Sequence, residues 1–103
     1  MNKVKIYSYA EECANIIKKS TGLALGDKIV GIYGATIPHW VGEIVGLEMM
    51  PGGIAVDVKW ANGSVSEMME YDIKNEKALE RALMGTQVGS PIGVYLANET
   101  EIV

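Results

Sequence analysis

The side chains that could carry out acid–base or nucleophilic chemistry are few in this 103-residue chain. His39 is the only histidine, and a histidine could act as a general base near neutral pH. Cys13 is the only cysteine, and neither it nor any serine stands in a nucleophile motif with His39. Cys13 also falls on an apolar helical stripe, which indicates a buried small side chain rather than a reactive thiolate. The sequence therefore predicts that the protein is not an enzyme.

Metal and cofactor sites lack their usual residues as well. With one His and one Cys, a metal ion would be bound mostly by carboxylates, and no Asp/Glu run has calcium-loop spacing. Glycines at 85, 89 and 93 could bring backbone N–H groups to a phosphate, but they match neither the P-loop nor the dinucleotide fingerprint. We interpret them as a helix cap and a loop, and we expect no metal and no cofactor.

Aromatic residues indicate binding rather than catalysis. Tyr33, Trp40, Trp60 and Tyr71 lie on or near predicted strands, where they could gather into a cage or groove. Such a group would bind a cationic or apolar side chain, and cation–π attraction would contribute about 0.5–2 kcal/mol. The alternative is that Trp60, which continues an apolar strand face, belongs to the core with Trp40 packed beside it. The residues predicted to bind a partner are Tyr33, His39, Trp40, Glu43, Met49, Met50, Glu70 and Tyr71.

Apolar residues at turns and strand ends suggest self-association. The pair Met49-Met50 precedes a proline turn, and Met68-Met69 ends a predicted strand, so one methionine of each pair would face outward unless helices cover both faces. Exposed methionines suit an adaptable protein-binding surface. We expect a homo-oligomer that associates through the last strand or through the Met and Trp surface.

The net charge of −4 argues against nucleic-acid binding, because phosphate contacts require a basic face and the nine Lys and Arg residues are scattered. The first residues lack the apolar segment of a signal peptide, and no apolar run approaches the 18 residues of a membrane span. We therefore expect a cytoplasmic protein with no membrane contact.

The periodicity of the chain predicts one domain, residues 1–103, of class α+β. Alternating lysines indicate an edge strand at 3–7, followed by a helix at 9–21 with a Ser8/Glu11 capping box. Together these form an N-terminal strand-and-helix unit at 3–21. Strand patterns over 26–73 predict a small, strongly bent antiparallel sheet or barrel. A second helix is expected at 75–84 and a last strand at 92–97.

Two predicted turns flank the clearest strand of the predicted sheet. Pro51 lies in a glycine-rich turn before the clearest strand, 54–60, in which apolar and polar residues alternate. Asn62-Gly63 then predicts a tight hairpin with a type I′ turn, whose two central residues need positive φ.

Residues 26–73 resemble a small SH3-like barrel of the Tudor, chromo-like and KOW kind. The resemblance lies in Gly26-Asp27-Lys28-Ile29-Val30, in Trp40 to Gly46, in Val56 to Trp60 and in Glu70-Tyr71-Asp72-Ile73, where such barrels often carry a helical turn. It covers under half of the chain and implies a binding module more than a reaction.

Three hypotheses about function follow. The first is a non-enzymatic adaptor that acts through protein–protein contacts and self-associates. The second is a small-molecule or nucleotide-binding, sequestering protein with a pocket at an oligomer interface near residues 85–93. The third is a small acidic inhibitor of a larger protein, of the kind that mobile elements encode, and its binding would be sensitive to salt.

Overall fold

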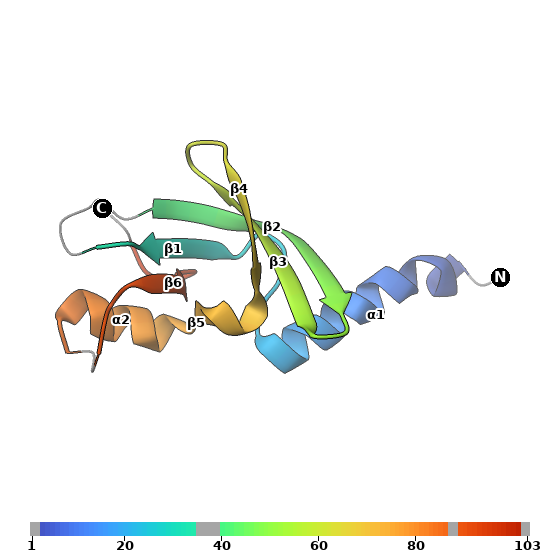
Figure 1. Cartoon of the computed structure of the whole chain (residues 1–103). Coiled ribbons are helices and arrows are strands. Elements are labelled where there is room, and N and C mark those ends of the chain that lie inside the picture. The colour runs from blue at the N-terminus through green and yellow to red at the C-terminus, as the bar shows by residue number, and fades with distance from the viewer. Residues whose placement is uncertain (1–2, 35–39, 87–88, 102–103) are drawn as a thin grey trace.

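The computed structural model describes residues 3–34, 40–86 and 89–101, with side chains from residue 12 onward. It contains two α-helices, six strands and one 3-10 turn in the described part of the chain (Figure 1). Their order is α1 (Lys3–Thr21), β1 (Lys28–Ile32), β2 (Trp40–Met50), β3 (Gly53–Trp60), β4 (Val65–Met69), η1 (Glu70–Asp72), β5 (Ile73–Lys74), α2 (Glu76–Met84) and β6 (Gly93–Leu96).

The six strands form one curled sheet in the order β4-β3-β2-β1-β6-β5. Neighbouring strands are antiparallel except β5 and β6, which pair in parallel. The predicted α+β fold with a bent sheet and two flanking helices is confirmed. The sheet is a half-barrel, because the curl leaves β4 and β5 as its two ends, and it is mixed rather than purely antiparallel. The expected helical turn at 70–72 is η1.

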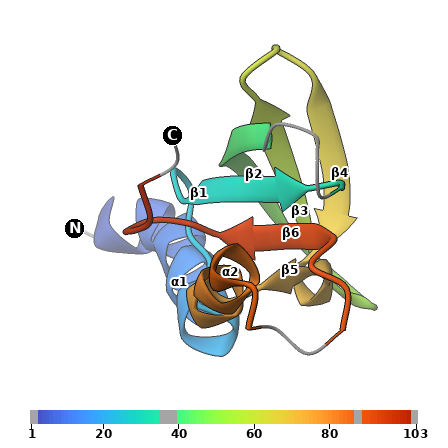
Figure 2. The ribbon, with the colours of Figure 1, turned by 90° about the vertical axis from the view of Figure 1, so that its left-hand side faces the viewer.

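Each face of the sheet carries its own core. The concave face buries Ile29, Ile44, Val56, Val58 and Trp60, with Ile17 and Leu23 from the end of α1 and the segment after it. The opposite face buries Val30, Ile32 and Tyr95 against Leu79 of α2. Figure 2 shows β1 and β6 side by side, with α2 packed below β6. Helix α2 therefore covers β1 and β6 and leaves the outer face of β2, β3 and β4 without a helix.

The predicted strand at 3–7 is wrong, because these residues form the first turns of α1. The segment continues the helix that follows it, so its backbone N–H and C=O groups are satisfied within α1 and it needs no neighbouring strand. Ser8 is therefore a helix-interior position and not a cap. The second helix and the last strand agree with the prediction, at 76–84 and 93–96.

Side-chain and backbone caps define α2. The Oδ1 of Asn75 accepts a hydrogen bond from the Ala78 N–H at 2.9 Å, and Gly85 ends the helix in a left-handed conformation with φ of 73°. The predicted β3–β4 hairpin also forms, with Gly63 at φ of 90°. Its turn is not type I′, because no described residue other than glycine has positive φ. The three-residue connection from Trp60 to Ser64 needs positive φ only at Gly63.

Glu76, the first residue of α2, forms hydrogen bonds with the segment that follows β6. Its Oε2 accepts hydrogen bonds from the Glu99 N–H at 2.8 Å and from the Thr100 hydroxyl at 2.5 Å. Burial raises the pKa of Glu76, but these bonds and backbone bonds from residues 98–100 outweigh it and hold the pKa below its ordinary value. The sequence analysis did not anticipate this link, because the two residues that donate to Glu76 lie 23 and 24 positions after it in the chain.

We expect this link to weaken once the pH falls below the ordinary pKa of a glutamate. A carboxyl whose pKa is lower in the folded state adds stability above its unfolded pKa and loses it as the pH falls through the folded value. The wild type should therefore melt at a higher temperature than Glu76→Gln at pH 7, and the difference should shrink as the pH approaches 3. Thermal unfolding followed by circular dichroism at both pH values measures this, and a pH-independent difference would contradict it.

Candidate functional site

Three of the four predicted aromatic residues gather at one end of the half-barrel. Tyr33 follows β1, Trp40 begins β2 and Trp60 ends β3. Their ring centroids are 6.3 Å apart for Tyr33–Trp40 and 6.4 Å apart for the two other pairs, with interplanar angles of 69–84°. These are edge-to-face contacts, in which the positive edge of one ring meets the negative face of another.

The three rings differ in burial, because Trp60 is buried whereas Tyr33 and Trp40 are exposed. Trp60 is 5% exposed, and its Nε1–H donates a hydrogen bond to the Ser66 hydroxyl at 2.9 Å. Tyr33 is 46% exposed and Trp40 is 40% exposed. Trp60 thus belongs to the core, as its strand pattern allowed, whereas the other two present their outer surfaces to solvent. We call the exposed rings of Tyr33 and Trp40 the aromatic platform.

The aromatic platform offers exposed ring faces to a ligand. The three rings stand at 69–84° to one another with centroids 6.3–6.4 Å apart, and cation–π attraction acts within about 6 Å of a ring centroid. The chemistry available is apolar contact with the outer ring surfaces, together with cation–π attraction from a group that approaches from outside.

Two glycines leave the space that the aromatic rings occupy, because a side chain at either position would clash with a ring. A Cβ on Gly42, the cross-strand neighbour of Trp60, would lie 2.9 Å from Trp60 Cε3, 2.9 Å from the Lys59 carbonyl oxygen and 2.8 Å from Val58 Cγ1. A Cβ on Gly31, the neighbour of Trp40, would lie 2.7 Å from Tyr33 Cε2. Sequence reasoning missed both positions. The available signal was glycine inside strand patterns, which indicates that another group approaches closely.

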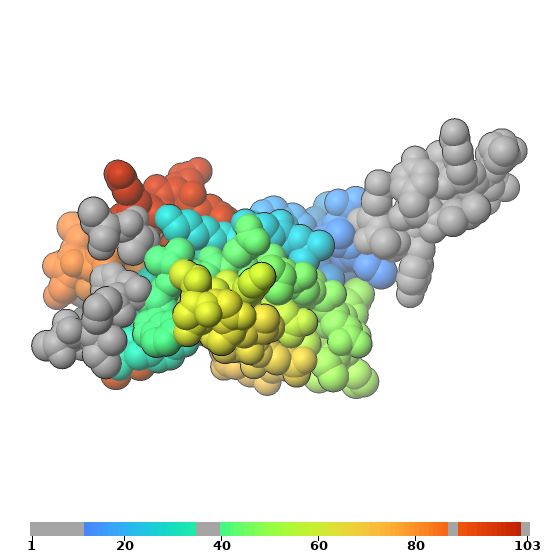
Figure 3. Space-filling model, turned by 90° about the horizontal axis from the view of Figure 1, so that it is seen from above, coloured from blue at the N-terminus to red at the C-terminus, as the bar shows by residue number. Residues whose placement is uncertain are grey.

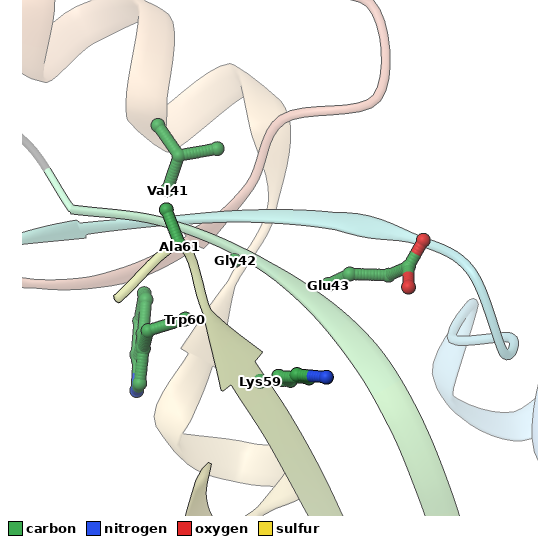
Figure 4. Close-up of a pocket in the computed structure, with 6 residues that line it drawn as sticks. All are labelled: Val41, Gly42, Glu43, Lys59, Trp60 and Ala61. Atoms are coloured by element: carbon green, nitrogen blue, oxygen red, sulfur yellow. The ribbon is translucent and has the colours of Figure 1, made fainter. Parts of the chain in front are cut away.

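A shallow hollow of about 460 Å³ opens beside Trp60 (Figure 4). Val41 and Ala61 lie on one side of the two strands and the Trp60 ring on the other, while Glu43 and Lys59 extend farther along the strands. Glu43 and Lys59 are direct cross-strand partners. The predicted binding residue Glu43 therefore lies on the same strand as Trp40 but on the opposite face of the sheet, because side chains alternate along a strand, and its neighbour is a lysine rather than an acidic group.

The other predicted residues lie at the opposite end of β2. Met49 and Met50 are 52% and 46% exposed, and Met50 pairs with Gly53 across the β2–β3 hairpin. A Cβ on Gly53 would lie 3.6 Å from Glu70 Oε1 and 3.8 Å from Tyr71 Cε2. Glu70 and the 67%-exposed Tyr71 therefore belong to this methionine end. Trp40 and Met50 are ten residues apart on β2, on the order of 30 Å along the strand.

The predicted site thus divides into two surfaces, and one candidate cannot be placed. The structure brings Tyr33 together with Trp40, and it brings Met50 near Glu70 and Tyr71. His39 lies outside the described residues. Figure 3 shows β2, β3 and β4, from green to yellow, on the upper face of the molecule.

The glycines at 85, 89 and 93 all have positive φ. Gly85 caps α2, with its N–H donating to the Ala82 carbonyl, and a Cβ on Gly93 would lie 3.1 Å from Lys74 Nζ. The first is a helix cap, as the sequence indicated, and the last makes room for a lysine that lies 5.3 Å from the Tyr95 ring centroid. Structural roles therefore explain two of the three glycines.

Among the residues that the structure describes, no three His, Cys, Asp or Glu side chains group so that they could hold a metal ion. Neither helix in the described part of the chain combines the length and apolarity that a membrane crossing requires.

Comparison of the chain with protein-family models, with curated proteins and with solved structures yields no match.

Proposed function

We propose that this chain is a non-enzymatic binding module that contacts a partner protein through the aromatic platform. The observation that supports this most is an exposed pair of large rings, Tyr33 and Trp40, held edge-to-face on the buried Trp60. Tyr and Trp are enriched where interfaces gain most of their binding energy, because they bury a large area at small entropic cost. A platform that is already ordered avoids further ordering cost on binding.

The hollow beside Trp60 has polar surroundings suited to an interface rim. Glu43 and Lys59 are exposed beside the hollow and offer one charge of each sign. Specific interfaces combine an apolar centre with such a rim. The expected ligand is therefore a segment that places an apolar or cationic side chain on the platform and polar groups near the β2–β3 pair.

Affinity capture from cells that naturally express the chain tests the proposal, with bound proteins identified by mass spectrometry. We expect a partner that the wild type captures and Tyr33→Ala/Trp40→Ala loses by at least about tenfold, since truncating a hot-spot aromatic costs about 2 kcal/mol or more and about 1.4 kcal/mol is tenfold. Met49→Ala/Met50→Ala, on the methionine end, is the matched control and should retain it.

The same experiment has outcomes that contradict the proposal. Capture that survives loss of the platform but fails in the methionine variant would place the interface at the other end of β2. Capture that 0.5 M salt abolishes for the wild type and both variants would favour the acidic-inhibitor hypothesis, because salt screens exposed charges far more than apolar contacts.

A further inference from the structure

The two ends of the curled sheet differ in how much strand edge they offer. The outer backbone N–H and C=O groups of an end strand have no strand partner, so such an edge can accept a further strand. At one end, β5 has only two residues, and short end strands offer little edge. At the other end, β4 has five residues, Val65–Met69, and pairs with β3 in continuous register. The edge of β4, at the margin of the sheet in Figure 2, is therefore the one that a further strand could use.

The register of the β3–β4 pair determines which backbone groups of β4 point outward. The Trp60 N–H donates to the Ser64 carbonyl at 2.8 Å, so these opposed residues form a hydrogen-bonded pair. Hydrogen-bonded and non-hydrogen-bonded pairs alternate along an antiparallel ladder. Ser66 therefore directs its N–H and C=O toward β3, whereas Val65 and Glu67 direct theirs away from it. Neither of these two residues makes a backbone hydrogen bond to any other segment in the described part of the chain.

The side chains of these residues lie on the outer face of the sheet. Their neighbours Ser66 and Met68 face the concave side, where Ser66 accepts a hydrogen bond from the core tryptophan and Met68 packs against the core. Side chains alternate along a strand, so Val65, Glu67 and Met69 face the other way. A strand added to β4 would therefore place every second side chain on the outer face, next to these three.

Charge on the outer face indicates which side chain fits beside Glu67. Glu67 lies directly opposite Asp57 of β3, and like charges at opposed positions destabilise a sheet. Lys59, on the same face of β3, lies opposite Val65 and not opposite Glu67. A Lys or Arg on an added strand would lie opposite Glu67 on its free side and offset the repulsion. Apolar residues two positions to either side of it would then lie opposite Val65 and Met69.

A second copy of this chain fits the edge less well. Two β4 strands that pair in antiparallel orientation over their full length bring Glu67 of one copy opposite Glu67 of the other. Four carboxylates would then lie in one row, because each Glu67 already lies opposite an Asp57. The charges therefore favour a strand from a different protein.

We propose that the β4 edge binds an extended segment of another protein in antiparallel pairing, with a Lys or Arg opposite Glu67. Apolar residues of that segment lie opposite Val65 and Met69. In this mode of recognition the main-chain hydrogen bonds give affinity, and the alternate side chains give specificity. The inference goes beyond the proposed function, because the aromatic platform of Tyr33 and Trp40 lies on other elements.

A capped heptapeptide, Thr-Val-Thr-Lys-Thr-Val-Thr, is the probe, because its side chains alternate as the proposal requires. Titrated into the isotope-labelled full chain, it should shift the amide NMR signals of β4, most of all those of Val65 and Glu67. The same peptide with Glu at its centre should bind at least about fivefold more weakly, since it places like charges opposite one another. A peptide whose central lysine carries a backbone N-methyl group keeps the charge but loses the N–H donor, so it should not bind.

Charge variants of the chain test the position of the basic residue. Glu67→Lys should reverse the preference between the lysine peptide and the glutamate peptide. Glu80→Lys changes the net charge of the chain by the same amount but lies on α2, so it should bind both peptides as wild type does. Tyr33→Ala/Trp40→Ala should also bind the lysine peptide as wild type does. Failure of this proposal and failure of the aromatic platform are thereby distinguishable.

Amide hydrogen exchange in the free protein supplies a second readout. The amides of Val65 and Glu67 should exchange at least about tenfold faster than those of Ser66 and Met68, which bond to β3. Equal protection of all four would show that the edge is already covered, and protection that rises with protein concentration would assign it to a second copy. Either result would overturn the proposal. So would equal affinity for the lysine and glutamate peptides, absence of binding by the lysine peptide, or signal shifts confined to residues outside β4.

Discussion

Replacing Trp60 with alanine should lower the free energy of unfolding by about 3–5 kcal/mol, the usual cost of truncating a buried Trp or Phe. Trp60 is 5% exposed, packs in the core of the concave face and donates its N–H to Ser66. Its removal leaves a cavity and an unpaired hydroxyl. Since small domains have about 5–15 kcal/mol of stability in total, this change consumes a large part of it.

Trp40→Ala is the matched control for this prediction. Trp40 has the same side chain and belongs to the same ring cluster, but it is 40% exposed. We expect it to cost about 1 kcal/mol, within the range of substitutions that leave the core intact. Urea unfolding followed by far-UV circular dichroism measures both variants without relying on tryptophan fluorescence. Equal losses would show that Trp40 and Trp60 contribute to one core.

Gly42→Ala should cost about 1–3 kcal/mol, because the added methyl group overpacks the sheet. The methyl would lie 2.9 Å from the Lys59 carbonyl oxygen, and this backbone atom cannot move without disturbing the β2–β3 pairing. Gly52→Ala is the control, since a Cβ there meets nothing within 4 Å and the position requires no positive φ. Urea unfolding should show a clear loss for the first variant and little change for the second.

Gly31→Ala should behave differently from Gly42→Ala although its clash is closer. The methyl would lie 2.7 Å from Tyr33 Cε2, the far part of an exposed side chain that can turn away, and 3.2 Å from Cη2 of the buried Trp60 ring, which has to shift slightly. We expect a loss of stability of about 1 kcal/mol, at the low end of the range for overpacking, together with weaker capture of the partner because the platform is disturbed. A variant that binds normally would indicate that the position of Tyr33 is unimportant for binding.

Much of the fold followed from the sequence where local rules and tertiary environment agree. Asn75 and Gly85 cap α2 as their types indicated, and the alternation in β3 allowed Trp60 as a core residue, one of the two alternatives that the sequence left open. The segment 3–7 is the counterexample. Its alternating lysines fit a strand, but the segment continues α1 and is not one of the six strands of the sheet in the described part of the chain. Whether a segment joins a sheet depends on long-range pairing and not on its own pattern alone.

In the candidate site, too, the sequence predicted the residue types, whereas the tertiary structure decided which residues lie together. The sequence by itself determined which aromatic and methionine residues were candidates for binding, and that side chains for acid–base and metal chemistry are few. Only the tertiary structure decided that Tyr33 joins Trp40 while Tyr71 joins Met50, because β2 carries its two ends far apart. Only the register between strands revealed Gly31 and Gly42 as the neighbours that admit the rings. Periodicity reports which face a residue occupies, whereas the position along the strand at which two segments meet is set by long-range pairing.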